Sequence, residues 1–419
     1  MSRTIAFIIP HHGHVNTNIG LLKELRRQGE EVICYCGKAY GELIKATGVE
    51  FRAFRLNVER FLYAYDSGKD GFDTISPEDK ISTRYRCAES ILKLNQMLFS
   101  SIPEEVRSFK PDYLIYDSLA YGVKWYAREL GIPAVCIDSC IASTSSMMEK
   151  NEDYYYTYFF GLSSEDRAKT DGLKIKKLIR EHEEDLGRRY GLQSFNIHDF
   201  YYSEDLNIAY TIKELQPFRE LLWNNFVQVG YQLQEQEGAN KSKDASTEGR
   251  PLIYITRGSF RQQGSHKFYE MCINAFKDSQ YRILITSGHE KVDYPEELIP
   301  ENIKIMEFVD QIAVLSEASV FVTHGGLSGV RESLLKGVPM VVCPSDFNQI
   351  QAAEIIKEQN AGVYLENDEL GENSLRESVD KVLNNNTYRE NAIRLGESLK
   401  AAGGYQAAVE HIIKLSVRS

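Results

Sequence analysis

The stretch VTHGGLSGVRESLLKGVP, residues 322–339, decides the fold of the second half of the chain. An apolar run ends at His324, two glycines follow, and a helical pattern that carries Glu332 ends before Pro339. A buried strand that turns directly into a helix places unpaired backbone N–H groups at the positive end of that helix, where an anion binds well. The stretch therefore predicts a strand–turn–helix junction with an anion site. An ordinary tight turn is the alternative interpretation.

Four features of this junction fit a nucleotide. Gly325 and Gly326 allow the chain to turn sharply and a ligand to approach the backbone. His324 is a polar donor at the same point, and Glu332, about two turns into the helix, is placed to accept hydrogen bonds from sugar hydroxyls. The stretch contains neither a G-x-G-x-x-G fingerprint nor a Walker lysine, so the sequence predicts neither a dinucleotide fold nor a P-loop.

Strand and helix patterns alternate on both sides of this stretch. Short apolar runs predict strands in both halves, at residues 4–9, 31–37, 113–118 and 133–139 and then at 251–259, 282–288, 303–309, 318–326 and 339–344. Amphipathic helical patterns lie between them. This alternation predicts an α/β fold of two Rossmann-like, doubly wound domains that face each other across a cleft, with ligands at the carboxyl ends of the strands.

Residues 236–250 interrupt the alternation, because they are polar and have no apolar periodicity. We therefore expect a linker there. The predicted domains are an N-terminal domain over 1–235, which binds a small molecule, and a C-terminal nucleotide-binding domain over 251–400. Residues 401–419 are expected to form a helix that packs back on the N-terminal domain.

Composition excludes several classes of protein. The net charge of −11 argues against a nucleic-acid partner, and no apolar run is long enough to span a bilayer. The apolar run at the N-terminus is too short for a secretory signal, so a cytoplasmic protein is expected. The seven cysteines are odd in number and mostly lie in apolar runs, which favours buried thiols over disulfides. Cys136 and Cys140 lack a second pair, which argues against a zinc site.

Polar side chains also follow two predicted strands of the N-terminal half. His14 lies just after the first strand and Asp117 closes another strand. Because the carboxyl ends of parallel strands share one edge of the sheet, the two side chains can meet as a general base and the carboxylate that orients it. The alternative is a structural role, in which His14 only caps the helix that begins there. A metal site at His11, His12 and His14 lacks a further ligand nearby.

Weaker signals come from a second strand end and from two aromatic clusters. Ser259 ends the strand predicted at 251–259 and is placed to donate to a phosphate, with Arg257 adding positive charge. The clusters at 61–65 and 154–160 either pack in the core or line a pocket for a flat or hydrophobic small molecule. The candidate acceptor residues are Tyr63, Tyr65, Tyr155 and Phe159.

The segments PHHGHVNTNIGLLKELRRQG (10–29) and FVDQIAVLSEASVFVTHGGLSGVRESLLKGVPMVVCPSDFNQIQAAE (308–354) resemble those of the family 1 UDP-glycosyltransferases, in particular the bacterial macrolide branch. The resemblance covers essentially the whole chain. It implies the GT-B fold and a UDP-sugar donor. It also implies an inverting, metal-independent transfer of a sugar to a hydroxyl or similar nucleophile of a small acceptor.

The resemblance also implies a role for each matching residue. His14 becomes the general base and Asp117 its orienter. The implied donor site combines a uracil-stacking ring, diphosphate contacts in the 326–330 turn, a ribose-binding acid and a pair that grips the sugar hydroxyls; its residues are Ser259, Phe308, Val309, Gln311, His324, Gly326, Ser328, Gly329, Glu332, Asn348 and Gln349.

Four residues depart from the family pattern. Thr17 replaces a proline, Ser328-Gly329 stands where many members have Asn-Ser, and Asn348 replaces an acid. Asn348 leaves the donor sugar open, while Gln349 fits glucose.

We therefore expect a hexosyltransferase that moves glucose from a UDP-sugar to a macrolide, polyketide or flavonoid type of acceptor. No cofactor or metal is expected, and the protein would be a monomer or homodimer. A sugar-nucleotide epimerase and a non-catalytic binding protein of the same fold are the alternatives.

Overall fold

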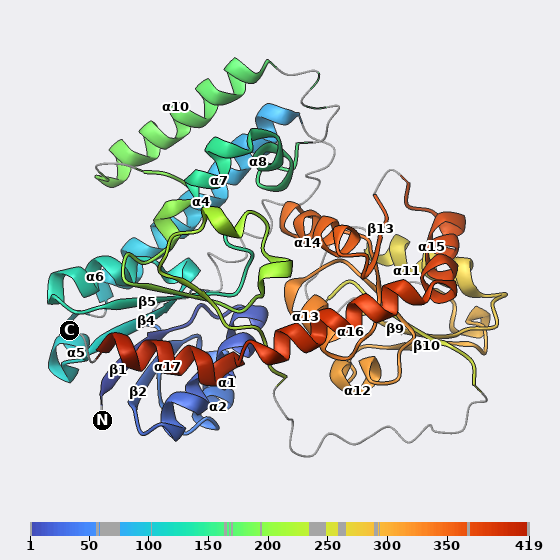
Figure 1. The fold of residues 1–419 in the computed structure, drawn as a ribbon, viewed down its shortest axis with the longest axis horizontal. Coiled ribbons are helices and arrows are strands. Elements are labelled where there is room, and N and C mark those ends of the chain that lie inside the picture. The colour runs from blue at the N-terminus through green and yellow to red at the C-terminus, as the bar shows by residue number, and fades with distance from the viewer. Residues whose placement is uncertain are drawn as a thin grey trace. The chain divides into compact units, whose positions relative to one another are not determined.

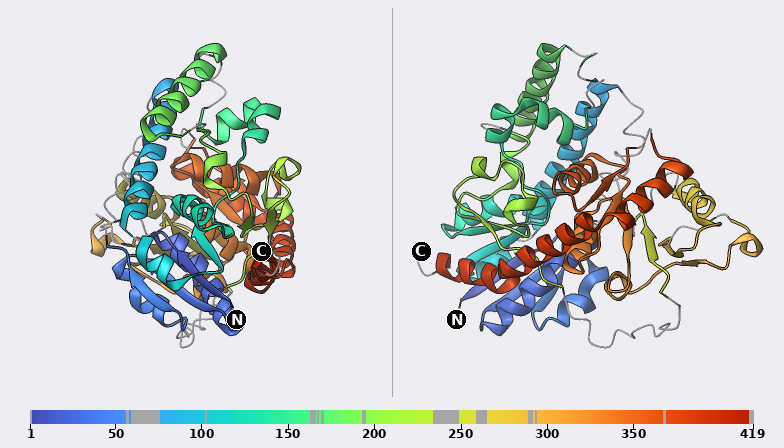
Figure 2. Two further views of the ribbon diagram at one scale, coloured as in Figure 1. Left: turned by 90° about the vertical axis from the view of Figure 1, so that its left-hand side faces the viewer. Right: turned by 45° about the vertical axis from the view of Figure 1, so that its right-hand side comes forward.

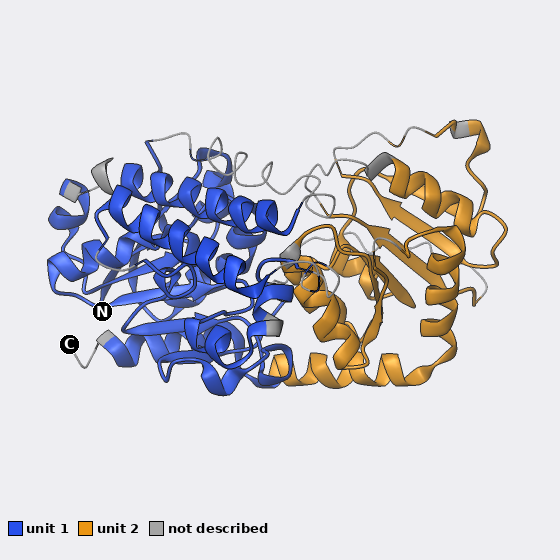
Figure 3. Ribbon diagram, turned by 90° about the horizontal axis from the view of Figure 1, so that it is seen from above, with its two compact units in different colours: residues 1–69, 74–234, 401–419 blue, residues 70–73, 235–400 orange. Residues whose placement is uncertain are grey.

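The computed structural model describes residues 2–55, 58, 76–101, 103–162, 166, 168, 171–192, 195–233, 249–258, 265–288, 292, 294–366 and 369–416. These residues form two compact units, each built around one parallel sheet (Figure 3). The first unit holds the described residues from 2 to 233 together with 401–416, and the second holds those from 249 to 400. Of the expected linker, residues 236–248 lie outside the described part.

The described part of the first unit contains a seven-stranded sheet in the order β3-β2-β1-β4-β5-β6-β7 (Figure 1). All neighbouring strands pair in parallel. Their bounds are β1 Arg3–Phe7, β2 Glu31–Cys36, β3 Glu50–Ala53, β4 Tyr113–Asp117, β5 Ala134–Asp138, β6 Leu206–Ala209 and β7 Phe226–Gln228. Every residue of β4 and β5 is buried, as expected for central strands covered on both faces.

The position of β1 beside β4 determines where a ligand can bind. Their register pairs Phe7 with Tyr116, so the two strands end side by side. Strands β2 and β3 lie beyond β1, whereas β5, β6 and β7 lie beyond β4. The connections therefore leave in opposite directions at this point, which opens a crevice at the carboxyl edge of such a sheet.

The helices of the first unit begin and end at residues suited to these positions. Their bounds are α1 His12–Arg27, α2 Gly41–Lys45, α4 Pro77–Ser101, α5 Pro103–Phe109, α6 Gly122–Leu130, α7 Ser145–Lys150, α8 Glu152–Tyr158, α10 Gly172–Tyr190 and α17 Gly404–Ser416. The Asp171 carboxylate caps α10 by accepting from the Leu173 N–H. Helices α6 and α10 end at Gly131 and Gly191, whose left-handed φ angles of 67° and 66° suit glycine.

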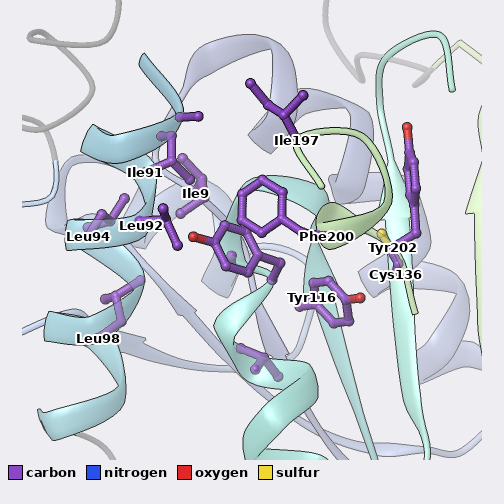
Figure 4. Packing of buried hydrophobic residues seen from close by; sticks show 14 of the residues in the cluster. Ile9, Ile91, Leu92, Leu94, Leu98, Tyr116, Cys136, Ile197, Phe200 and Tyr202 are labelled. Atoms are coloured by element: carbon purple, nitrogen blue, oxygen red, sulfur yellow. The ribbon is translucent and has the colours of Figure 1, made fainter. Parts of the chain in front are cut away.

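One face of the first sheet packs against α4. Figure 4 shows Ile91 and Leu92 of this helix on the side that faces the Phe200 ring, with Leu98 further along the helix. These side chains belong to one cluster of buried residues, and burying each aliphatic side chain contributes roughly 1.5–3 kcal/mol. Packing in this core therefore holds β4 in place, and with it Asp117 at the end of the strand.

The C-terminal helix belongs to the first unit. Helix α17 packs against α1 (Figures 1 and 2), and the Gly404 N–H donates to the Val229 carbonyl at 2.6 Å. The Tyr405 ring lies edge-on to Tyr210, with 5.5 Å between the centroids. Because α1 carries His14, this contact supports the helix that holds a candidate site residue.

The described part of the second unit contains a six-stranded parallel sheet in the order β10-β9-β8-β11-β12-β13. Its strands are β8 Leu252–Thr256, β9 Arg282–Thr286, β10 Ile303–Met306, β11 Val320–Thr323, β12 Met340–Val342 and β13 Gly362–Tyr364. Its helices are α11 Ser265–Phe276, α12 Gln311–Leu315, α13 Leu327–Leu335, α14 Phe347–Glu358, α15 Glu372–Asn384 and α16 Asn386–Ala401. The direction of the connections reverses between β8 and β11, where Thr256 pairs with Thr323.

The prediction of two doubly wound α/β sheets is confirmed. The predicted junction at 322–339 is also present, with β11 leading through Gly325 and Gly326 into α13. In the part of the chain that the structure describes, no helix combines the length and apolar character needed to cross a bilayer.

Candidate active site

His14 and Asp117 meet at the carboxyl edge of the first sheet. His14 lies in the first turn of α1, directly after β1, and Asp117 is the last residue of the neighbouring β4. The His14 Nδ1 atom is 2.6 Å from the Asp117 Oδ2 atom. The two residues are 9% and 1% exposed, so water screens this contact weakly.

The contacts around this pair hold both side chains in place. The Asp117 Oδ1 atom accepts from the Leu119 N–H at 3.0 Å, which leaves Oδ2 for the imidazole. The His11 ring lies edge-on to the His14 ring at 5.2 Å. A carboxylate can only accept, so the proton of a neutral His14 lies on Nδ1 and Nε2 is the basic nitrogen.

His324 follows β11 in the second unit and is enclosed by two glycines. A Cβ atom at Gly326 would lie 2.6 Å from the His324 Nε2 atom, and one at Gly258 would lie 2.7 Å from its Cε1 atom. Gly258 follows the neighbouring strand β8 and has a φ of +86°. Only glycine fits at either position without displacing the imidazole, so these backbones define where the ring lies.

The electrostatic environment keeps His324 uncharged. Burial lowers the pKa of His324 from 6.5 to about 4, the Arg257 guanidinium lowers it further, and the Asp346 carboxylate opposes this shift. The His324 Nδ1 atom is buried and makes no hydrogen bond of good geometry within the described part of the chain, although a backbone contact with Thr256 raises the pKa of the ring. Buried polar atoms normally have a partner, so a ligand oxygen is a chemically suitable partner here.

Glu332 belongs to a row of polar side chains in the same unit. The Gln311 Nε2 atom donates to Glu332 Oε2 at 2.6 Å, and the Tyr254 hydroxyl donates to Gln311 Oε1 at 3.2 Å. Burial raises the pKa of Glu332, while the hydrogen bond from Gln311 lowers it. Gln311 therefore orients one carboxylate oxygen, and the other can accept from a ligand.

Helix α13 starts at a glycine. Gly326 is the N-cap residue and has no side chain with which to cap the helix. The N–H groups of a first helical turn have no partner within the helix, so they can donate to a ligand. Ser328 and Gly329 lie half-buried in the first turn. A Cβ at Gly329 would lie 3.6 Å from the Gln311 Nε2 atom, so Gly329 packs beside the Gln311–Glu332 pair.

Asn348 and Gln349 lie in the first turn of α14. Asn348 is half-buried and Gln349 is 8% exposed. The Gln349 side chain bonds to Ser345 and Asp346. Phe308, after β10, is 51% exposed, and Val309 beside it is half-buried.

Of the aromatic cluster at 154–160, Tyr155, Tyr156 and Phe160 lie in the core. Tyr155 is 2% exposed and its hydroxyl bonds to the His198 Nε2 atom. The ring of Phe159 stacks on Tyr155 at 5.3 Å and is half-buried. Three residues named from the sequence, Tyr63, Tyr65 and Ser259, lie outside the described residues.

Sequence reasoning did not identify two residues that the structure adds to the second unit's site. Asp346 caps α14 and lies near His324, and Tyr254 bonds to Gln311. Aspartate is a favoured N-cap residue, so the position of Asp346 before a helical pattern was a usable signal. Tyr254 gave no such signal, because a tyrosine within an apolar strand reads as core.

No three His, Cys, Asp or Glu side chains gather into a metal-binding arrangement in the part of the chain that the structure covers. Cys34, Cys136, Cys272 and Cys343 are buried free thiols. Burial raises the pKa of the Cys343 thiol to about 12, so it stays protonated at neutral pH.

Comparison with known proteins places this geometry among enzymes that transfer sugars. Residues 276–415 match the family described as the C-terminal domain of erythromycin biosynthesis protein CIII-like proteins. Over 99% of its length the chain is 29% identical to the uncharacterized UDP-glucosyltransferase YojK of Bacillus subtilis (strain 168), 97% of which is covered. It is 23% identical to the oleandomycin glycosyltransferase of Streptomyces antibioticus, with 97% of this chain and 89% of that one covered.

A solved structure has the same fold. The glycotransferase of kitacinnamycin matches with a TM-score of 0.75 and 22% identity, covering 99% of both chains. The two parallel α/β sheets and these similarities define a glycosyltransferase with the GT-B fold. Over nearly its whole length the chain is similar to glycosyltransferases of this kind, in agreement with the resemblance that its sequence motifs carry.

Proposed function

We propose that the enzyme transfers glucose from UDP-glucose to a hydroxyl of a hydrophobic small molecule, with inversion at the anomeric carbon. The observation that carries this proposal is the 2.6 Å contact between His14 Nδ1 and Asp117 Oδ2 at the sheet's switch point. Similarity to a UDP-glucosyltransferase supports the donor. Similarity to an oleandomycin glycosyltransferase supports a macrolide or related acceptor.

His14 acts as the general base in this proposal. The acceptor oxygen loses its proton to His14 Nε2 as it attacks the anomeric carbon. The new C–O bond forms while the bond from that carbon to the diphosphate oxygen breaks, and UDP leaves with the bonding electrons. Asp117 stabilises the imidazolium that forms, since it accepts the Nδ1–H and is itself buried.

The second unit binds the donor in this proposal. The diphosphate bonds to His324 and to the backbone N–H groups at the start of α13, which stabilise the charge that develops on the leaving group. Glu332 accepts from the ribose hydroxyls, and the half-exposed Phe308 ring stacks on uracil, with Val309 and Gln311 beside it. Asn348 and Gln349 contact the glucose. Ser259, which lies outside the described residues, is proposed to donate to a phosphate.

The proposed reaction needs no divalent cation, because hydrogen-bond donors of the protein stabilise the negative charge of the diphosphate. We assign the acceptor pocket to the aromatic side chains named from the sequence. Within the described residues, the half-buried Phe159 can face an acceptor, and Tyr155, which is 2% exposed, supports it from the core by stacking on its ring. A hydrophobic, ring-containing acceptor fits aromatic walls. We also propose that the enzyme works in the cytoplasm, where nucleotide sugars are available.

The test is transfer by the purified enzyme. A panel of UDP- and dTDP-sugars is incubated with a library of phenolic and macrolide acceptors, with and without EDTA, and products are identified by mass. The proposal predicts a product heavier by one hexose from UDP-glucose, in equal yield with EDTA. The absence of any UDP-glucose product, or its loss with EDTA, would contradict it.

A further inference from the structure

Asp346 divides its carboxylate between two tasks at the start of α14. Its Oδ1 atom accepts from the backbone N–H groups of Asn348 at 2.8 Å and Gln349 at 3.1 Å, which caps the helix. Its Oδ2 atom accepts from the Gln349 side-chain Nε2 at 2.9 Å. Capping needs only one oxygen, so the second contact calls for a separate explanation.

The orientation of the Gln349 amide is determined by its partners. Its Oε1 atom accepts from the Ser345 N–H at 2.8 Å and from the Ser345 hydroxyl at 2.9 Å. A backbone N–H can only donate, so it requires the amide oxygen on its side. A carboxylate can only accept, so it requires the amide nitrogen on the other side. Rotating the amide by half a turn would break the bonds to the Ser345 N–H and to the Asp346 carboxylate; the Ser345 hydroxyl, which can donate or accept, would fit either orientation.

Gln349 is also held against the turn that carries His324. Gly325, with a φ of +91°, lies so close that a Cβ atom there would be 3.1 Å from the Gln349 backbone oxygen. The same Cβ would lie 2.8 Å from the Val342 side chain. The Gln349 amide is thus fixed in direction by Ser345 and Asp346, and in position by the turn at Gly325.

We propose that Asp346 is a positioning residue for the donor sugar. By binding one hydrogen of the Gln349 amide nitrogen, Asp346 directs the remaining N–H toward the glucose, where it donates to a hydroxyl oxygen. This inference rests on the proposed function, in which Gln349 contacts the sugar. It implies that the site favours a hexose with a hydroxyl at that position, because a sugar without it leaves the buried N–H unpaired.

The substitution Asp346→Asn separates the two tasks of this side chain. Asparagine caps helices as well as aspartate does, so the contacts to the backbone N–H groups survive. Its Nδ2 atom would however face the Gln349 Nε2 atom, and two donors cannot bond. The Gln349 amide then loses its fixed direction while α14 stays capped. The matched control is Asp171→Asn, which changes an N-cap residue in the same way at α10, in the other unit.

The experiment measures the affinity of each variant for UDP and for UDP-glucose by calorimetry, together with kcat and KM for the donor. For Asp346→Asn we expect UDP affinity within about twofold of the wild type and UDP-glucose affinity about tenfold weaker, the loss of roughly one well-placed hydrogen bond. Asp346→Ser keeps a capping oxygen without a clashing donor, so its affinity for UDP-glucose should lie between those of the wild type and Asp346→Asn. Asp171→Asn should bind both ligands as the wild type does.

Two outcomes would overturn the inference, and a third would overturn the proposed function. Equal loss of UDP and UDP-glucose affinity in Asp346→Asn would mean that the residue acts only on the helix end. Unchanged affinity for both would mean that Gln349 needs no orienting partner. Failure of the wild-type enzyme to bind UDP at all would contradict the donor site itself, and the inference would fall with it.

Discussion

His14 Nδ1 and Asp117 Oδ2 lie 2.6 Å apart although 103 positions separate them in the sequence. Helix α1 and strand β4 bring them together because β1 and β4 are neighbours whose carboxyl ends coincide. The contact fixes the tautomer of a buried imidazole beside the switch point of the first sheet. The role proposed for His14 depends on this tautomer.

Asp117→Asn tests the tautomer. Asparagine can still accept from the Leu119 N–H, but its amide would then present a donor to Nδ1, which forces the imidazole proton onto Nε2. We expect kcat to fall by about 10²–10⁴, with little change in the KM for the donor. The control is Asp138→Asn at the end of the neighbouring β5, where one oxygen likewise accepts a backbone N–H, that of Cys140. A similar loss of kcat in both variants would contradict the assignment.

Gly326→Ala tests the close fit around His324. Gly326 has a φ of −60°, so alanine causes no backbone strain, but its Cβ would lie 2.6 Å from the imidazole Nε2 atom. The ring must move, and we expect the Kd for UDP to rise by about tenfold or more, the loss of at least one charge-assisted contact. Gly172→Ala is the matched control, because a Cβ at Gly172 meets nothing within 4 Å. Wild-type UDP affinity in Gly326→Ala would show that the diphosphate does not depend on this ring.

His324 should make the enzyme less stable in acid. Burial lowers its pKa to about 4. As the pH falls, this side chain is therefore protonated near pH 6.5 in the unfolded chain and only near pH 4 in the folded enzyme. The free energy of unfolding therefore falls as the pH drops through this window, by at most about 1.4 kcal/mol per pH unit for this one group. Denaturant unfolding at pH 7 and pH 5 should show a smaller loss for His324→Asn than for the wild type. An equal loss of unfolding free energy in both proteins would contradict the lowered pKa of His324.

Glu332→Gln tests the ribose contact. Gln311 can still donate to the new side chain, but the second oxygen becomes an N–H donor. We expect the Kd for UDP to rise about tenfold. Because burial raises the pKa of Glu332, wild-type affinity for UDP should also weaken on acidification before an ordinary glutamate would protonate. Glu332→Gln should lack this dependence, whereas Glu317→Gln, at an exposed position, should retain it. Identical pH profiles for Glu332→Gln and the wild type would contradict the assignment.

Much of the fold follows from short-range patterns in the sequence. Apolar runs that alternate with amphipathic helices predict the two parallel sheets, and the rule that parallel strands end at one edge predicts that His14 and Asp117 meet. The Gly325-Gly326 pair predicts the turn: Gly325 has a φ of +91°, which few other residues tolerate, and Gly326 leaves no room for a Cβ beside His324.

The hydrogen-bond networks within the second unit could not be predicted in this way. The Asp346–Gln349–Ser345 contacts depend on side-chain rotamers that periodicity does not encode. Likewise, the sequence could not decide whether Tyr155 lies in the core or lines a pocket, because a run of aromatic residues is compatible with both.

Replacement of His14 by alanine tests the central claim most directly. With UDP-glucose and an acceptor found by screening, we predict that kcat for His14→Ala falls by about 10²–10⁴ at pH 7 while the Kd for UDP stays at the wild-type value. His411→Ala, which removes an exposed histidine of α17, should transfer glucose at the wild-type rate. Wild-type turnover by His14→Ala would contradict the account.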